Sequence, residues 1–99
     1  MATEFTELRS LASAAAGAEP GPESSILKLK GTEIQQRVQK LTVEAGGIYS
    51  AAWGATPVGH KFAHGGMSGY LASRAYTIYG GASEVQRDVV AKNVLGLKK

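Results

Sequence analysis

A long stripe of apolar residues between positions 22 and 46 constrains the fold of this 99-residue chain more than any other feature. Its members are Leu27, Gly31, Ile34, Val38, Leu41 and Ala45. A spacing of three and four residues places them on one face of an α-helix, opposite a charged face. Pro22 and Glu23 suit a first helical turn, and Gly46 and Gly47 suit its end. We therefore predict a helix over residues 22–46. Within it, Gly31 either admits another backbone or is a tolerated surface glycine.

Three other segments show the helical period. Residues 3–16 carry one apolar face of Phe5, Leu8, Ala12 and Ala15, and residues 68–79 carry another of Leu71, Ala75 and Ile78. Over residues 83–96 we predict a helix that begins at Ser83 as N-cap, with Gln86 completing a capping box, and ends near Gly96. Its apolar side consists of Val85, Val89, Val90 and Val94.

Residues 47–67 have no sustained period and contain several glycines, with Trp53 and Phe62 as isolated apolar anchors. They are predicted to form a long loop with one short helical turn. No strand alternation of useful length occurs in the sequence. The predicted fold class is therefore all-α, an antiparallel helical bundle of three to four main helices with a glycine-rich loop.

Bulk composition excludes several classes of protein. The chain has no cysteine, which excludes disulfides and thiolate catalysis and is compatible with a reducing compartment. No apolar stretch approaches the roughly 20 residues that cross a bilayer, and the start lacks the basic and apolar regions of a secretory signal. A formal charge of +3 gives little support to nucleic-acid binding. We expect neither a membrane nor a nucleic-acid partner.

Several side chains are compatible either with a functional role or with a purely structural one. His60 and His64 are four residues apart, but no third ligand is evident, so no metal site is predicted. Three tyrosines form either a cofactor-stacking stripe or ordinary packing at helix faces: Tyr70, Tyr76 and Tyr79. Arg74 and Arg87 suit a phosphate or a partner's carboxylate, or are solvated at the surface.

Two motifs carry a resemblance to a known family. Residues 22–37, PESSILKLKGTEIQQR, resemble a helix in the C-terminal domain of acyl-CoA dehydrogenases. Residues 77–87, TIYGGASEVQR, followed by AKNVLGL at 91–97, resemble that family's C-terminal signature. The resemblance covers residues from about 7 to 97. It implies that residues 1–99 are part of the C-terminal helical domain of a much longer FAD-dependent enzyme, whose other domains lie outside this chain.

The resemblance also implies roles for single residues. Gly81 would adjoin the substrate, and Ala82, Ser83 and Glu84 would contact FAD. Many members carry a glutamate general base at the position of Gly80, and glycine cannot take a proton. No catalytic residue is therefore expected in this chain. A Gln-x-x-Gly-Gly-x-Gly pattern that often helps to hold FAD in the family is also absent.

The expected function follows from this resemblance. The chain would supply flavin contacts and an oligomer interface to an α,β-dehydrogenase of acyl-CoA thioesters, and would be inactive alone. The base would lie on a helix outside this chain, or the chain would belong to a base-less subunit of a mixed complex. Expected partners are acyl-CoA in the parent protein, and a second copy, in a dimer or tetramer, or a related dehydrogenase subunit.

The C-terminal end of the sequence resembles that of bacterial family members, including some that act on bulky or steroid-derived acyl-CoA thioesters. We therefore expect a bacterial cytoplasmic protein. A different class of function is also open. The chain could be a non-catalytic helical module that only associates, because a bundle without its usual partners exposes apolar helix faces.

Overall fold

The computed structural model describes residues 1–19, 21–52, 59 and 61–98, with Phe62 described by its backbone alone. These residues contain helices and turns and no strand, which confirms the predicted all-α class. The chain divides into two compact units, one formed by Met1–Thr32 with Gly80–Lys99 and the other by Glu33–Tyr79. Each unit is described by itself below.

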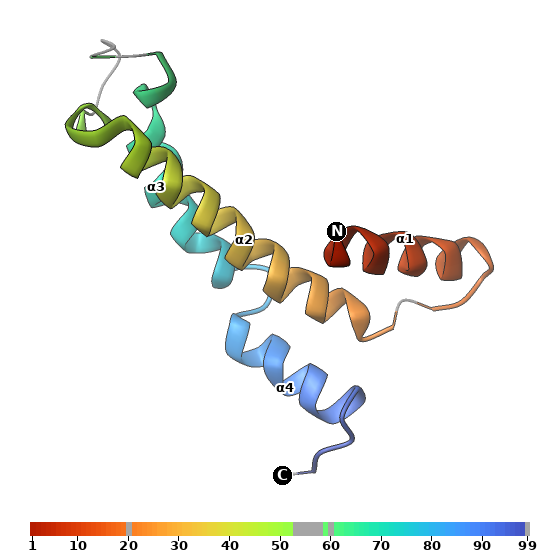
Figure 1. Cartoon of the computed structure of the whole chain (residues 1–99). Helices are drawn as coiled ribbons and strands as arrows, with labels where there is room; N and C mark the ends of the chain where they lie inside the picture. The colour runs from red at the N-terminus through yellow and green to blue at the C-terminus, as the bar shows by residue number, and fades with distance from the viewer. Residues whose placement is uncertain (20, 53–58, 60, 99) are drawn as a thin grey trace. The chain divides into compact units, whose positions relative to one another are not determined.

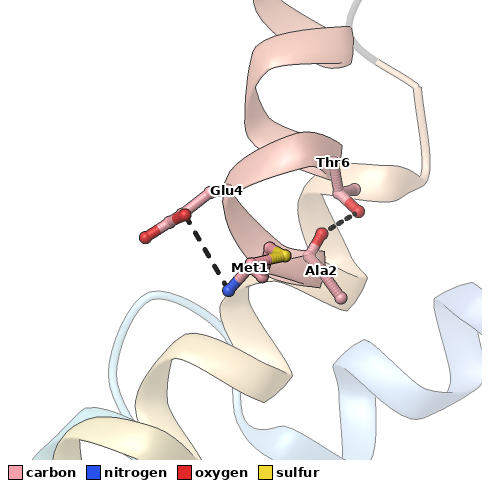
Figure 2. A network of polar contacts seen from close by, with 4 residues as sticks. All are labelled: Met1, Ala2, Glu4 and Thr6. Carbon is pink, nitrogen blue, oxygen red and sulfur yellow. Dashed lines mark hydrogen bonds and ion pairs between the residues drawn. The ribbon is translucent and has the colours of Figure 1, made fainter.

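The first helix, α1, spans Ala2–Ala15 and ends before Gly17, whose φ of +83° takes the backbone out of the helix. The Thr6 hydroxyl donates to the Ala2 carbonyl oxygen over 2.9 Å, and the Met1 ammonium lies 3.8 Å from Glu4 Oε2 (Figure 2). Both ionic groups are exposed, so this pair contributes little to stability. No residue of α1 is buried, and Phe5 and Leu8 are exposed. Within its unit this helix therefore gains little stability from burial of apolar side chains.

The second helix, α2, spans Glu23–Gly46 and begins one residue after the expected start at Pro22. The Ser25 amide donates to the Pro22 carbonyl oxygen over 3.1 Å, which places Pro22 just before the helix, where its missing N–H costs nothing. At the other end, Gly47 has a φ of +57° and ends α2 as its sequence indicates.

In the unit of residues 33–79, the second half of α2 pairs with the segment that returns along it (Figure 1). This segment contains two short 3₁₀ helices and one α-helix: η2 (Lys61–Ala63), α3 (Gly66–Ser73) and η3 (Arg74–Thr77). Four pairs of residues lie opposite each other: Gln36 and Ser73, Gln39 and Gly69, Thr42 and Gly66, and Gly46 and Ala63. Residue numbers rise along α2 from pair to pair while they fall along the returning segment. The pairing is therefore antiparallel.

Small and polar residues make this pairing. Gln36 Nε2 donates to the Ser73 carbonyl oxygen over 2.9 Å and lies 3.3 Å from Thr77 Oγ1. A Cβ on Gly46 would overlap Ser50 Oγ and lie 3.0 Å from the Ala63 methyl group. Glycine at position 46 therefore lets the 3₁₀ helix η1 (Gly47–Ala51) and η2 close onto α2.

The apolar stripe of α2 lies away from this pairing and is exposed. Ile34, Val38 and Leu41 have exposed fractions of 50%, 53% and 60%. Among the described residues, Ala63 is the only buried hydrophobic side chain. The helical period was read correctly, but the face that packs within the unit is the one that bears glutamine, threonine and glycine. The physical reason is that a single returning segment covers one face only, and close backbone approach selects the smaller residues.

Other boundaries also differ from expectation. Residues 47–51 and 61–63 form 3₁₀ turns inside the segment predicted as loop, and α3 begins at Gly66 and becomes 3₁₀ at Arg74, so residues 68–79 are not one helix. The last helix, α4, spans Ser83–Asn93 and stops three residues before the expected end at 96. The predicted anchors Trp53 and the Phe62 side chain lie outside the described residues.

Candidate functional site

The candidate site is the turn of Gly80 and Gly81 and the start of α4 behind it. Both glycines have positive φ, +65° for Gly80 and +99° for Gly81, a region that other residues adopt only with strain. No described atom lies within 4 Å of the point where a Gly80 Cβ would stand, so this side of the turn is open. At Gly81 a Cβ would overlap the side-chain nitrogen Nε2 of Gln86. The turn thus requires glycine for its backbone at both positions.

The first turn of α4 has no side-chain cap. Ala82 is the N-cap, and the first intrahelical bond runs from the Gln86 amide to the Ala82 carbonyl oxygen over 2.9 Å. The predicted capping box is wrong, because Ser83 is the first helical residue and its side chain makes no capping hydrogen bond. The amides of Ser83, Glu84 and Val85 precede that first bond and have no intrahelical acceptor. They are donors available to a ligand.

The residues predicted to contact ligands lie together because they are consecutive in the chain. Gly81, Ala82 and Ser83 are half-buried, whereas Glu84 is exposed in the first turn of α4. Gly80 is exposed and has no side chain that could carry a proton. The arrangement offers backbone donors and close approach, and no acid–base group at the turn itself.

One functional candidate was missed by the sequence analysis. The Lys28 ammonium, from the second turn of α2, donates a hydrogen bond to the carbonyl oxygen of Gly81, 53 positions along the chain. Both residues belong to the unit formed by residues 1–32 and 80–99. In the sequence, Lys28 is one of several lysines on the polar side of a helix, and nothing in its spacing distinguishes it from Lys30.

The other residues considered in the sequence have structural partners. The Arg74 guanidinium lies 4.5 Å from the Tyr70 ring centroid, and its Nη2 lies 3.2 Å from Ser73 Oγ. Tyr76 and Tyr79 pack edge to face with ring centroids 5.8 Å apart. These contacts favour packing over cofactor stacking for the three tyrosines. Arg87 also has an interaction partner.

No group of three or more His, Cys, Asp or Glu side chains that could hold a metal ion occurs among the described residues. His64 lies in a turn, and His60 lies outside the described part of the chain. Within the described ranges, no helix is long and apolar enough to cross a membrane.

A hollow lies elsewhere in the same unit, beside α1 and the beginning of α2. It has a volume of about 480 Å³, and its lining includes Leu11, Ala14 and Leu27 together with Glu7, Glu19 and Glu23. None of residues 80–84 lines it. We therefore keep the glycine turn as the candidate site, because its chemistry rests on free backbone donors rather than on the size of a hollow.

Residues 1–95 match the family described as "Acyl-CoA dehydrogenase, C-terminal domain". The chain therefore belongs to the acyl-CoA dehydrogenase family. Members of this family generally bind FAD, act on acyl-CoA and are oligomeric.

Two curated relatives share a short stretch with this chain. Acyl-CoA dehydrogenase IpdE1 of Mycolicibacterium smegmatis is 60% identical over 30 residues, and acyl-CoA dehydrogenase IpdE1 of Mycobacterium tuberculosis is 57% identical over 30 residues. The matched stretch is 30% of this chain and only 8% of each relative. No solved structure gives a significant match.

FAD presents ring, ribityl and phosphate acceptor atoms, and the uncapped first turn of α4 presents N–H groups with the positive end of the helix dipole. The open side of Gly80 would let a flat group approach the backbone. The geometry of the turn is therefore compatible with a flat cofactor that is rich in hydrogen-bond acceptors, as FAD is.

Proposed function

We propose that this chain is the C-terminal helical portion of a FAD-dependent acyl-CoA dehydrogenase that converts an acyl-CoA thioester to its trans-2-enoyl form. The observation that carries the proposal is the family match over residues 1–95, which includes the uncapped first turn of α4. When bound, FAD accepts the hydride removed from the substrate. The residues of this chain bind and orient the reacting groups.

Each residue of the turn has a role in this proposal. The backbone amides at the start of α4, from Ala82 to Glu84, hold acceptor atoms of the flavin. Gly81 lies beside the acyl chain, where a side chain would separate substrate from cofactor. The positive end of the α4 dipole favours negative charge that develops on the bound cofactor.

The proposal assigns no general base to this chain. Gly80 has no proton-accepting group, and Glu84 lies on α4 beyond the turn, exposed to solvent. The base therefore comes from a helix outside this chain or from another subunit of a mixed complex. The chain alone is inactive and does not retain FAD through purification. Both relatives are mycobacterial, which supports a bacterial protein, and we place it in the cytoplasm.

The second candidate is a non-catalytic association module. It is supported by the exposed apolar side chains of α1 and α2, among them Phe5, Leu8, Val38 and Leu41. Apolar faces of this kind favour self-association into a dimer or tetramer. The two candidates differ in whether the glycine turn still recognises flavin.

The first experiment measures the molar mass of the purified chain by light scattering, with flavin absorbance on the same peak. We expect a colourless dimer or tetramer. A yellow peak would contradict the statement that the chain cannot retain FAD without the rest of the protein.

The second experiment tests the flavin contacts directly by adding FAD to the ¹⁵N-labelled chain. We expect amide shifts confined to residues 81–85. The start of α3 is a matched control, because Gly65 also has positive φ (+79°) and that helix also lacks a side-chain cap. Equal shifts at both helix starts would indicate non-specific anion binding. No shift at residues 81–85 would leave the association module as the function.

A further inference from the structure

The contact between Lys28 and the carbonyl oxygen of Gly81 joins the beginning of α2 to the turn before α4. Lys28 is half-buried, as are its neighbours Leu27 and Leu29, so its side chain does not extend freely into solvent. A hydrogen bond from an ammonium group is stronger than one between neutral groups. The contact therefore restrains the turn more than an ordinary backbone bond would.

The turn needs such a restraint because it consists of two consecutive glycines. Glycine has the widest range of backbone conformations, and Gly80 and Gly81 both use the positive-φ region. Without a fixed point, the chain before α4 could adopt many orientations. The Gln86 side-chain amide lies against Gly81 as well. Gly81 is thus held by a residue from α2 and by a residue from α4.

The atom that Lys28 holds belongs to the same peptide group as a predicted flavin contact. The Gly81 carbonyl and the Ala82 N–H form one planar unit, so fixing the oxygen also fixes the direction of the N–H. An ammonium group on the carbonyl polarises that peptide, and a polarised peptide is a better N–H donor. The contact therefore acts on both the orientation and the strength of the Ala82 donor.

We propose that Lys28 is a positioning residue for the flavin-facing turn, acting through the Gly81–Ala82 peptide group. This inference rests on the proposed function, because the turn must face FAD for its orientation to matter. Lys28 does not touch the reacting atoms. It keeps the Ala82 N–H directed at the cofactor and strengthens it as a donor.

The wild-type chain permits a direct test of the contact. A scalar coupling across the hydrogen bond, between Lys28 ¹⁵Nζ and the Gly81 carbonyl carbon, is expected in a suitably labelled sample at low pH and low temperature. Absence of this coupling, under conditions where the Lys28 ammonium signal is resolved, would overturn the proposal.

Three variants test the effect on the turn: Lys28→Met, Lys28→Arg and Lys30→Met. We expect Lys28→Met to lower the ¹⁵N order parameters of Gly80, Gly81 and Ala82 from about 0.85 to below about 0.6. Lys28→Arg should keep them near the wild-type value, since its guanidinium can still donate to the carbonyl. Lys30→Met is the matched control from the same helix and should leave them unchanged. Rigid turn amides in Lys28→Met would overturn the proposal.

Adding FAD to the same variants separates this proposal from the proposed function. If both hold, Lys28→Met weakens the FAD-induced shift of the Ala82 amide about tenfold, and Lys28→Arg restores it. If the order parameters fall but FAD shifts no amide even in the wild type, the proposed function fails and the positioning role fails with it. If the wild type responds to FAD and Lys28→Met responds equally, only the positioning role is overturned.

Discussion

Two serines with exposed fractions of 0% differ in how their hydroxyl groups are satisfied. Ser73 Oγ donates to the Tyr70 carbonyl oxygen over 2.6 Å and accepts from Arg74. Ser50 Oγ has no hydrogen-bond partner among the described residues. A buried hydroxyl group without a hydrogen-bond partner destabilises the folded state, whereas one with a partner stabilises it.

The same substitution should therefore have opposite effects at these two positions. We expect Ser73→Ala to lower the free energy of unfolding by about 1 kcal/mol, and Ser50→Ala to leave it unchanged or raise it by about 1 kcal/mol. Urea denaturation of both variants measures the difference. If Ser50→Ala lowered the free energy of unfolding as much as Ser73→Ala, the Ser50 hydroxyl would have a hydrogen-bond partner in solution.

Gly80 permits a second test at the scale of one residue. Because its φ is +65°, a side chain there is strained although no described atom would be touched. Gly80→Ala should lower the free energy of unfolding by about 1–2 kcal/mol. Gly31 is the control, since it lies inside α2 with open space at its Cβ and a helical backbone. Gly31→Ala should raise the free energy of unfolding by about 1 kcal/mol. A higher free energy of unfolding for Gly80→Ala would contradict the positive φ of this turn.

At the scale of the element, the pairing of α2 with the returning segment depends on polar groups as well as on close approach. Gln36 donates to the Ser73 carbonyl oxygen and approaches Thr77, and Arg74 Nη2 lies 3.5 Å from the Gln36 carbonyl oxygen. These bonds join α2 to the region where α3 changes from α to 3₁₀ geometry. They fix the register of the pair, because few apolar side chains are buried between them.

Gln36 should consequently contribute more to the free energy of unfolding than its neighbour Gln35. We expect Gln36→Ala to lower the free energy of unfolding by about 1 kcal/mol. Gln35 is exposed, and Gln35→Ala should change it by less than about 0.5 kcal/mol. Thermal unfolding followed by circular dichroism compares the two variants. Equal effects would show that α3 does not pair with α2 through Gln36 in solution.

At the scale of the whole molecule, large apolar side chains are exposed among the described residues, whereas a domain that is stable alone buries them. Ala63 is buried, whereas Ile34, Val38 and Leu41 are about half exposed or more. A helical chain with so little buried apolar surface has a small hydrophobic contribution to folding. Its stability should therefore depend on a partner that covers these faces, and a second copy is the partner most directly available in a purified sample.

We expect the chain to self-associate through the exposed stripe of α2. Val38→Glu should weaken the association at least about tenfold, since it places a charge where an apolar side chain would be buried. Gln35→Glu adds the same charge outside the stripe and should have little effect. Light scattering over a concentration series measures both variants. An unchanged mass for Val38→Glu would exclude this face from the interface.

Much of the local structure was predictable, because it depends on residues close together in the chain. The 3.6-residue period and Gly46-Gly47 predicted α2 to within one residue at its start, and the prolines and glycines around position 20 predicted the break after α1. The cap of α4 was not predictable, because serine is a far better N-cap than alanine, yet Ala82 is the N-cap and Ser83 is the first helical residue.

The sequence by itself determined that the described part of the chain is helical, where α1 and α2 begin and end to within one residue, and that the glycine turn precedes the last helix. These features follow from backbone preferences and from periodicity, which act over a few residues. Only the tertiary structure decided which face of α2 is covered, that Ser50 Oγ has no hydrogen-bond partner among the described residues, and that Lys28 reaches Gly81. Those features depend on which segments meet in space. The residues that meet lie from 17 positions apart, for Gly46 and Ala63, to 53 positions apart, for Lys28 and Gly81. Local sequence pattern carries no information over such separations.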